Sequence, residues 1–520
     1  MKQLKFLLIT LIIFILPKIG SAADGTDKLI IFHTNDMHAR VMAEDDGGQS
    51  IGLAEMASAV KAVKSNSKNV FWFDAGDTLH GMPRINISRG ENIIPLLNAA
   101  GIDALVPGNH DFNYGSAQLE ALSKKLLFPT LSANIVDKNT GKRLFRAYRI
   151  YRLDSGVKVG VFGLSTPECA YKTNPSNVTN VEFLNPIDTA RDMVKKLRKR
   201  CDVVISVMHM GVDESSEFTS ERIAREVPGI DLIVDGHSHT TLPEGLTVNN
   251  TLIVQTGWHE YKLGCVEIDL RDHKIISKKA ELLDAEDVKK LAPVPDQKIA
   301  YALAAMEERN EKLFSEVVAH SDRFLTAERT ILRRGESEIG NLCADALRWR
   351  TGADIAIMNG GGMRTDLPAG DVTRGDVMAI FPFGNTVRVA EIDGKTIRAM
   401  LEHSVYGYPA SFGGFLDVSG MSFSFDPAKP VGHRVEDIFI GGKPIDDNKI
   451  YTMAATDFQL SGGDDYDMLK NLKIVGEYDT CEGVLTDYLN EVGMSGIGLG
   501  RINVLREVEL PADFEEREAA

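Results

Sequence analysis

The feature that most constrains this chain is a series of short apolar runs, most of which end in polar side chains. They lie between residues 28 and 259 and read KLIIFHTND, NVFWFDAGD, DALVPGNHD, VKVGVFGLS, CDVVISVMHMG, DLIVDGHSH and TLIVQTGWH. Runs of this length, rich in Val, Ile and Phe, are typical of buried β-strands. Amphipathic stretches lie between them, including GLAEMASAVKAVKS and NPIDTARDMVKKLRKR, in which Asn185 and Pro186 predict a helix start. The alternation predicts an α/β fold.

The length of 520 residues is too great for one ordinary domain. A content of 43% hydrophobic and 25% charged residues is that of a chain that folds around sizeable cores. The stretch PVPDQKIAYALAAMEERNEKLFSEV begins with two prolines and continues with strong helix formers, and it separates two α/β patterns. We therefore expect a first domain over residues 24–291, a helical linker over 292–317 and a second domain over 318–510.

The N-terminus has the pattern of a cleavable export signal over residues 1–23. A basic start, MKQLK, precedes an 11-residue apolar run and the small residues GSAA, which predicts a periplasmic or secreted protein. The run is short for a membrane span, which needs about 20 apolar residues, so no stable membrane anchor is expected. Removing the signal's three lysines lowers the formal net charge from −16 to −19. Such a charge disfavours a nucleic-acid polymer as partner but does not exclude a small anion.

Potential metal ligands gather where the apolar runs end. Ligand sites in α/β folds lie at the carboxyl ends of strands. The candidates there are Asp36, His38, Asp77, Asn109, His209, His237 and His239. Asp36 and His38 are two residues apart, which in a strand aims both side chains to one side, and His237 and His239 repeat this spacing. Each residue alone is more often an ordinary polar loop residue. Together they suffice for two metal ions, and imidazole with carboxylate suits Zn, Mn or Fe rather than Ca.

The same motifs carry a family resemblance. TNDMH, AGDT, PGNHDF, MHMG and DGHSH, in this order, resemble the calcineurin-like dinuclear metallophosphoesterases. In the second half, GESEIGNLCADALRW, ADIAIMNGGGMR, FPFGN and DFQLSGGDDY resemble the C-terminal nucleotide-binding domain of bacterial periplasmic and animal ecto 5′-nucleotidases. The resemblance runs from about residue 28 to 508. It implies a calcineurin-like β-sandwich flanked by helices, followed by a second α/β domain.

The resemblance also implies how the metal ligands are shared. One ion is held by Asp36, His38, Asp77 and His239. The other is held by Asp77 as the bridge, with Asn109, His209 and His237. Zn, Mn or Co is expected, and relatives often carry Gln where His239 stands. Two cations roughly 3.5–4 Å apart would activate a bridging hydroxide for attack on phosphorus and neutralise the phosphate oxygens.

His110 corresponds to the catalytic histidine of the resembled family, which stabilises the phosphoryl group in the transition state. Relatives have an Asp three residues later, and this chain has Asn113. An amide can accept a hydrogen bond from an imidazole but favours the imidazolium less than a carboxylate does. Either His110 is less easily protonated here, or Asp111 compensates. Similar motifs with Asn occur in relatives that hydrolyse cyclic nucleotides and 3′-nucleotides.

Six residues of the second half are implied to bind the nucleotide. They are Arg333, Asn359, Arg364, Phe383, Phe458 and Asp464. The two phenylalanines would stack on the base, which gains about 1–3 kcal/mol, and Asp464 would bind the ribose. Arg334, next to Arg333, is an alternative at that position. Without the resemblance, each Phe would be read as a core residue.

The function predicted from these observations is an exported, dinuclear metal-dependent 5′-nucleotidase that acts on a small nucleotide. Two other activities of the same class stay open. One is a 2′,3′-cyclic-nucleotide 2′-phosphodiesterase with 3′-nucleotidase activity, and the other is a UDP-sugar hydrolase. A different class is a secreted nucleotide-binding protein that has lost catalysis, which the full ligand set disfavours.

Overall fold

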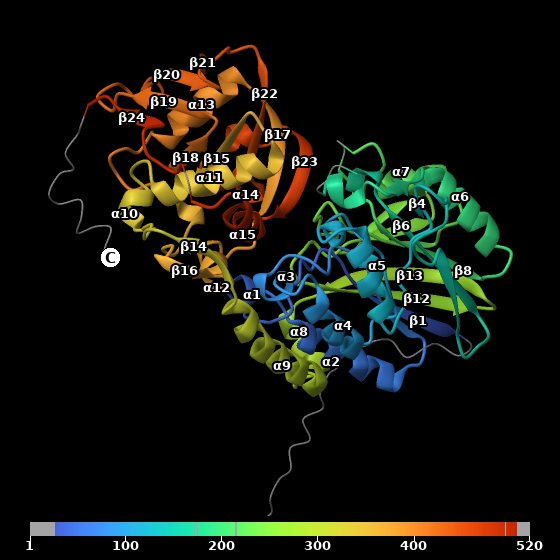
Figure 1. The fold of residues 1–520 in the computed structure, drawn as a ribbon. Helices are drawn as coiled ribbons and strands as arrows, with labels where there is room; N and C mark the ends of the chain where they lie inside the picture. Colours follow the sequence, from blue (N-terminus) through green and yellow to red (C-terminus); the bar gives the residue numbers. More distant parts are fainter. Residues whose placement is uncertain (1–25, 171, 174, 214–215, 495, 507–520) are drawn as a thin grey trace, which may run out of the picture.

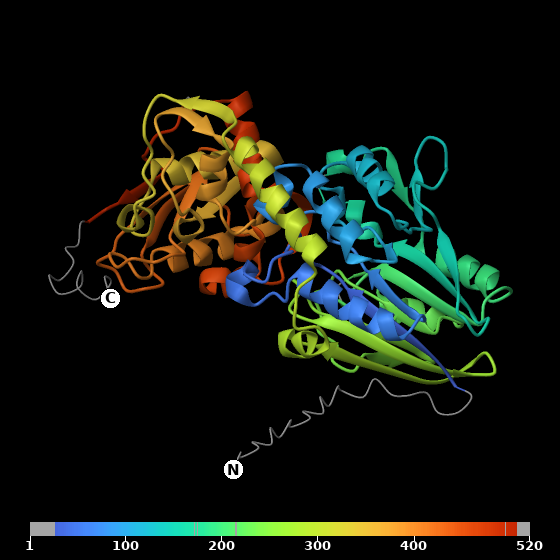
Figure 2. The ribbon, with the colours of Figure 1, turned by 90° about the horizontal axis from the view of Figure 1, so that it is seen from below.

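The computed structural model describes residues 26–170, 172–173, 175–213, 216–494 and 496–506. The predicted export signal lies outside these residues. Figure 1 shows two lobes, with helix α9 (Gln297–Phe314) between them, and Figure 2 shows the same helix from below. Among the described residues, no helix is long and apolar enough to cross a membrane. The five cysteines are all buried free thiols.

The first lobe is a sandwich of two β-sheets. One sheet has the order β13 (Lys274–Leu283), β12 (Leu263–Arg271), β1 (Asp27–Thr34), β2 (Val70–Asp74) and β3 (Ala104–Leu105). The other has the order β10 (Leu246–Val248), β11 (Thr251–Val254), β9 (Leu232–Val234), β8 (Val203–His209), β6 (Lys158–Ser165) and β5 (Tyr148–Arg152). Alternate side chains, such as Ile31 and Phe73 from the first sheet and Val161 and Ile205 from the second, form one core between the sheets.

Helices cover the outer faces of both sheets. Side chains of α2 (Leu53–Asn66), α4 (Ile94–Ala100) and α5 (Ser116–Lys125) share a core with Phe32 and Trp72 of the first sheet. Helices α6 (Pro186–Leu197) and α7 (Ser220–Glu226) share one with Phe162 and Ile233 of the second. The predicted helix start is confirmed, because the Asn185 side chain accepts the backbone N–H groups of Ile187 and Asp188. The predicted sandwich flanked by helices is therefore present.

The second lobe is also α/β. Its main sheet has the order β18 (Leu416–Ser419), β15 (Ile355–Asn359), β22 (Ile450–Thr456), β17 (Thr386–Asp393) and β23 (Lys473–Thr480). One face carries α11 (Glu338–Thr351), α12 (Arg374–Ile380) and α15 (Cys481–Glu491). The other carries α13 (Gly394–Ser404) and a small sheet of β21 (Lys443–Pro444), β20 (Val435–Ile440), β19 (Met421–Phe425) and β24 (Ile502–Val504).

Short elements complete the described chain. They are α1 (Asp45–Gly48), α3 (Pro83–Asn86), β4 (Ile135–Asp137), β7 (Val181–Phe183), α8 (Ala285–Leu291), β14 (Val317–Ser321), α10 (Arg329–Leu332), β16 (Gly370–Thr373) and α14 (Asp457–Leu460), together with single 3₁₀ turns such as 110–112, 167–170 and 463–465.

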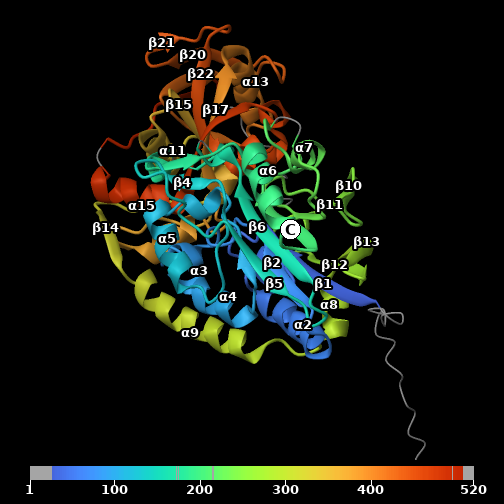
Figure 3. The same ribbon diagram turned by 90° about the vertical axis from the view of Figure 1, so that its right-hand side faces the viewer.

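Helix α9 packs onto the first lobe, along the edge seen in Figure 3. Ile299 and Met306 are fully buried in the core beside α2 and α4. The Asn310 amide donates to the carbonyl of Arg84 at 2.9 Å and accepts from the Asn92 side chain at 2.6 Å. Most of the predicted linker is thus fastened to the first lobe, and the chain passes into the second lobe after α9 ends at Phe314.

Candidate metal centre

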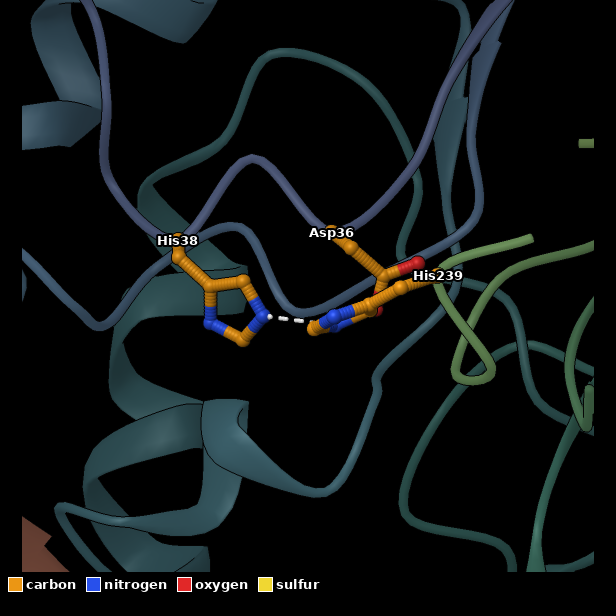
Figure 4. Close-up of side chains that lie close together, drawn as sticks. All are labelled: Asp36, His38 and His239. Carbon is orange, nitrogen blue, oxygen red and sulfur yellow. Dashed lines mark hydrogen bonds and ion pairs between the residues drawn. The ribbon is translucent and has the colours of Figure 1, made fainter. Parts of the chain in front are cut away.

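Three overlapping clusters of side chains beyond the carboxyl ends of β1, β2, β3, β8 and β9 could each hold a metal ion: Asp36, His38 and His239; Asp36, Asp77 and His209; and His38, Asp77 and His110. In the first cluster, Nε2 of His239 lies 3.2 Å from Nε2 of His38 and 3.5 Å from Oδ1 of Asp36 (Figure 4). In the second, Nε2 of His209 lies 3.2 Å from Oδ2 of Asp77 and 3.9 Å from Oδ1 of Asp36. Within each cluster one ligand atom per residue lies within 4.8 Å of the others.

The remaining two predicted ligands lie beside these clusters. Nδ1 of His237 is 3.0 Å from Oδ1 of Asn109. The backbone N–H of His237 donates to Asp36, and the backbone N–H of His110 donates to Asp77 at 2.7 Å. The structure therefore brings all seven predicted metal ligands together.

The ligands are brought together by a backbone conformation other than the strand alternation predicted from the sequence. Strands β1 and β9 end at Thr34 and Val234, so the ligand pairs stand beyond the strands and strand alternation does not aim them. Instead, five ligands have left-handed backbone conformations. Their φ values are 51° for Asp36, 46° for His38, 55° for Asp77, 81° for His237 and 53° for His239. This conformation is uncommon for residues other than Gly and is found mostly in Asn, Asp and His.

Asp111 holds two of these ligand-bearing loops together. Its carboxylate accepts the backbone N–H groups of Asp77, Thr78, Leu79 and Gly108, at 2.8–3.0 Å. A Cβ at position 108 would collide with the Asp77 carboxylate, so only glycine fits there. Burial, with the nearby charge of Asp77, raises the pKa of Asp111 to about 7 against the effect of these N–H donors. Both carboxylate oxygens serve the loops, so Asp111 does not compensate for Asn113 at His110.

His110 lies between Asn113 and the second lobe. Its Nδ1 is 3.2 Å from the amide nitrogen of Asn113, and its Nε2 is 3.4 Å from Oε2 of Glu477 on β23. The same amide nitrogen is 3.2 Å from Nδ1 of His80, and the amide oxygen accepts from the Thr173 hydroxyl at 2.9 Å. Asn113 therefore presents a donor to His110, whereas the sequence led us to consider an acceptor.

The ionisable groups in the centre strongly shift one another's pKa values. Burial alone would raise the pKa of Asp77, but His209 and His110 outweigh it and hold that pKa well below its usual value. Burial would lower the pKa of His209, but Asp77 and Asp36 raise it to about 10. Burial, with the neighbouring His110, lowers the pKa of His38 well below its usual value. A cation bound beside His209 would compete with a proton for its ring nitrogen.

The donor set fits divalent metal ions. Nε2 of His209 is fully buried and makes no well-aligned hydrogen bond to any described residue. Its Nδ1 lies 2.7 Å from the Ala75 carbonyl, which leaves Nε2 to face Asp77 and Asp36. A buried nitrogen lone pair aimed at two carboxylates is what a cation of the Zn or Mn type would satisfy.

A cavity of about 530 Å³ opens beside the centre, between the two lobes. The first lobe contributes five predicted site residues and five others to the lining. They are Asp77, Asn109, His110, His237 and His239, together with Lys172, Asp213, Ser238, Trp258 and His259. The second contributes Asn385, Arg388, Asp457, Phe458, Ser461, Ile474 and Glu477. Of the six residues predicted to bind the nucleotide, only Phe458 lines this cavity. Lys172 was missed, although it follows the VKVGVFGLS strand end, and no local pattern marks Glu477.

The other predicted nucleotide-binding residues form two groups elsewhere on the second lobe. Asn359 donates to Asp464 at 2.8 Å, and both Asp464 and Arg333 lie against Gly413. The guanidinium carbon of Arg364 lies 5.7 Å from the ring centre of Phe383. Phe383 is 49% and Phe458 42% exposed, so neither is a core residue.

Two family models match the chain. Residues 29–241 match the calcineurin-like phosphoesterase family, and residues 317–471 match the 5′-nucleotidase C-terminal domain. The first match covers the lobe that carries the candidate metal centre. The chain is thus a calcineurin-like phosphoesterase, that is, a metal-dependent phosphoester hydrolase.

Relatives that match most of the chain identify its family within the metal-dependent phosphoester hydrolases. Protein UshA of Yersinia enterocolitica is 30% identical over 495 residues, which cover 86% of this chain and 88% of the relative. The 5′-nucleotidase of Vibrio cholerae is 29% identical, with coverage of 85% and 86%. A crystal structure of the 5′-nucleotidase precursor from Thermus thermophilus is 30% identical, covers 93% of this chain and 100% of that one, and has a TM-score of 0.54. The chain belongs to the 5′-nucleotidase family.

Proposed function

We propose that the chain removes phosphate from nucleoside 5′-monophosphates, with two divalent cations held by the first lobe and the nucleoside held by the second. The observation that carries this proposal is that the metal-ligand clusters and the exposed ring of Phe458 share one cavity. An aromatic face beside a cation site suits a base attached to a phosphate. Membership of the 5′-nucleotidase family supports the phosphoester chemistry.

The two cations are assigned to the two groups of ligands. One group is Asp36, His38, Asp77 and His239, and the other is Asp77, Asn109, His209 and His237. Zn, Mn and Co all suit imidazole with carboxylate. When bound, such ions neutralise phosphate oxygens and lower the pKa of a water held between them.

We assign His110 to contact the phosphate group and Asn113 to orient the His110 ring. Nε2 of His110 lies 3.4 Å from the Glu477 carboxylate, so an anionic oxygen fits at this position. A phosphoryl oxygen placed there would accept a hydrogen bond from His110, which stabilises charge that grows in the transition state. Asn113 and the Thr173 hydroxyl that contacts it keep the ring in this orientation.

Recognition of the nucleoside requires the second lobe to turn. Glu477 and Arg388 face the metal centre in the observed arrangement, whereas Asn359, Asp464 and Arg333 gather outside the cavity. The junction after Phe314 is the natural place for such a movement, between a first domain over 24–291 with its connector over 292–317 and a second domain over 318–510. A TM-score of only 0.54 to a 30% identical, fully covered relative is what different lobe arrangements would produce.

The proposal that the protein is exported rests on the sequence pattern of residues 1–23 alone.

Chromatographic analysis of the products from four substrates tests the proposal, because a cyclic phosphodiester or a pyrophosphate can be cleaved without release of free phosphate. We expect AMP to be hydrolysed with a higher kcat/KM than 3′-AMP, 2′,3′-cyclic AMP or UDP-glucose, and chelation to abolish activity until Zn, Mn or Co returns. Elemental analysis of the active enzyme should find two ions per chain. Preference for 3′-AMP or the cyclic nucleotide would move the chain to the alternative activity. No hydrolysis of any of the four by metal-loaded protein would support the non-catalytic alternative.

A further inference from the structure

The two ring nitrogens of His237 face different partners. Nδ1 lies 3.0 Å from the Asn109 side-chain oxygen, whereas Nε2 lies 3.0 Å from Oε2 of Glu168 and 3.1 Å from Nζ of Lys172. A neutral imidazole carries one proton, so only one of these nitrogens can donate. The position of that proton decides whether Nδ1 or Nε2 is free to bind a metal.

Glu168 and Lys172 both contact Nε2, on the side of the ring away from Asn109. A proton on Nε2 would be donated to the Glu168 carboxylate, and a lone pair there would accept from the Lys172 ammonium. In either case Nε2 has a partner, and Nδ1 is the ring nitrogen that faces the side-chain oxygen of Asn109. With the proton on Nε2, Nδ1 and the Asn109 oxygen are two acceptors 3.0 Å apart that a cation would join, and ligating histidines generally donate their other N–H to such a carboxylate.

The segment around Glu168 also orients Asn109. The Asn109 amide nitrogen donates to the backbone carbonyl of Lys172 at 2.8 Å, which turns the amide oxygen toward His237. The Lys172 ammonium forms a 2.6 Å ion pair with Glu168, whose side chain is 9% exposed. The ammonium thus balances a buried carboxylate whose other partner is a neutral ring. An ordinary exposed Glu–Lys pair at this spacing would contribute little and orient nothing.

We propose that Glu168 and Lys172 are the positioning residues of one half of the metal centre, the half formed by Asn109 and His237. Glu168 holds His237 with Nδ1 ready to bind the ion, the Lys172 carbonyl holds Asn109 with its oxygen ready, and the Lys172 ammonium compensates the charge of Glu168. This inference rests on the proposed assignment of Asn109 and His237 as metal ligands. It concerns metal affinity, and it does not depend on which phosphoester is the substrate.

The test is a metal titration of the full chain after removal of metals by chelation. Zn²⁺ or Mn²⁺ alone is added to wild type, Glu168→Ala and Glu168→Gln, and the binding steps are followed by calorimetry. We expect two steps in wild type, and one of them to weaken by about 10- to 100-fold in Glu168→Ala, the usual effect of removing a partner of a ligating histidine. Glu168→Gln should lose less, because its amide oxygen still accepts from Nε2 of His237.

The matched control is Glu120→Gln, which disrupts an exposed Glu–Lys pair of the same spacing on α5. It should leave both steps unchanged. Thermal melting of each metal-free variant reports whether it folds. Two unchanged steps in a folded Glu168→Ala would overturn the inference, as would equal weakening of both steps together with a lowered melting temperature. Wild type that binds fewer than two ions would instead refute the dinuclear assignment, so the two failures are distinguishable.

Discussion

The two lobes contribute to the site in different ways. In the first lobe, all seven predicted metal ligands already converge, and buried carboxylates such as Asp111 hold their loops in place. In the second lobe, Phe458 reaches the cavity while Asn359 and Asp464 pair with each other outside it. The predicted metal ligands are therefore already assembled, whereas the residues predicted to bind the nucleoside are not. If the proposed roles hold, variants of the two lobes should separate hydrolysis from nucleoside recognition.

The largest effect is expected for His110→Ala. Loss of a group that stabilises transition-state charge should lower kcat by about 10²- to 10⁴-fold, equally for AMP and for a small aryl phosphate. Metal content should stay at the wild-type value, because His110 is not among the assigned ligands. Steady-state kinetics and elemental analysis measure the two quantities. A variant that loses its metals would show that the ring belongs to the metal centre itself.

Phe458→Ala should affect recognition alone. Loss of stacking worth about 1–3 kcal/mol lowers kcat/KM for AMP by roughly 5- to 150-fold. The aryl phosphate should change far less, because its ring need not reach Phe458. Asp77→Asn changes a proposed metal ligand instead, so it should lower the hydrolysis of both substrates together. Equal losses on both substrates, or none on AMP in stably folded Phe458→Ala, would remove Phe458 from the nucleoside site.

Glu477→Gln should raise activity modestly. Glu477 ties β23 to His110 in the observed arrangement, and this contact opposes the turn of the second lobe. A contact of this kind is worth at most about 1 kcal/mol, so its loss would increase the fraction of competent molecules, and with it kcat/KM for AMP, by up to roughly 5-fold. The control is Glu391→Gln, which breaks an exposed pair with Lys473 in the same sheet. Unchanged or lower kcat/KM in Glu477→Gln, at an unchanged melting temperature, would contradict this role.

The smallest effect is expected for Asn113→Asp, and it is a shift rather than a loss. A carboxylate beside the imidazole of His110 favours its protonated form, so the basic limb of the pH–rate profile should move to higher pH, by about one unit. Asn113→Ala removes the contact without adding charge and should lower the rate without moving the profile. An unmoved profile for Asn113→Asp would show that position 113 does not influence His110.

Local sequence patterns predicted much of this molecule. Apolar runs followed by polar residues identified strands such as β8, which ends on the predicted ligand His209, and Asn185 marked the start of α6. The patterns did not reveal Glu168 against His237, or Glu477 against His110. These pairs join residues far apart in the chain, and their meeting depends on sheet register and on how the lobes pack. A motif describes which side chains are present but not which backbone conformation aims them.

The left-handed conformations of Asp36, His38, Asp77, His237 and His239 limit which residue types the metal centre can contain. Among residues with a side chain, Asp, Asn and His tolerate this conformation best, and these are also the types that ligate Zn and Mn. Backbone and metal therefore select the same residues at these positions. A designer who tried to install a β-branched residue there would meet backbone strain before any question of coordination arose. Attempts to change the metal preference of this fold have more freedom at His209 and Asn109, whose φ values are not in the left-handed region.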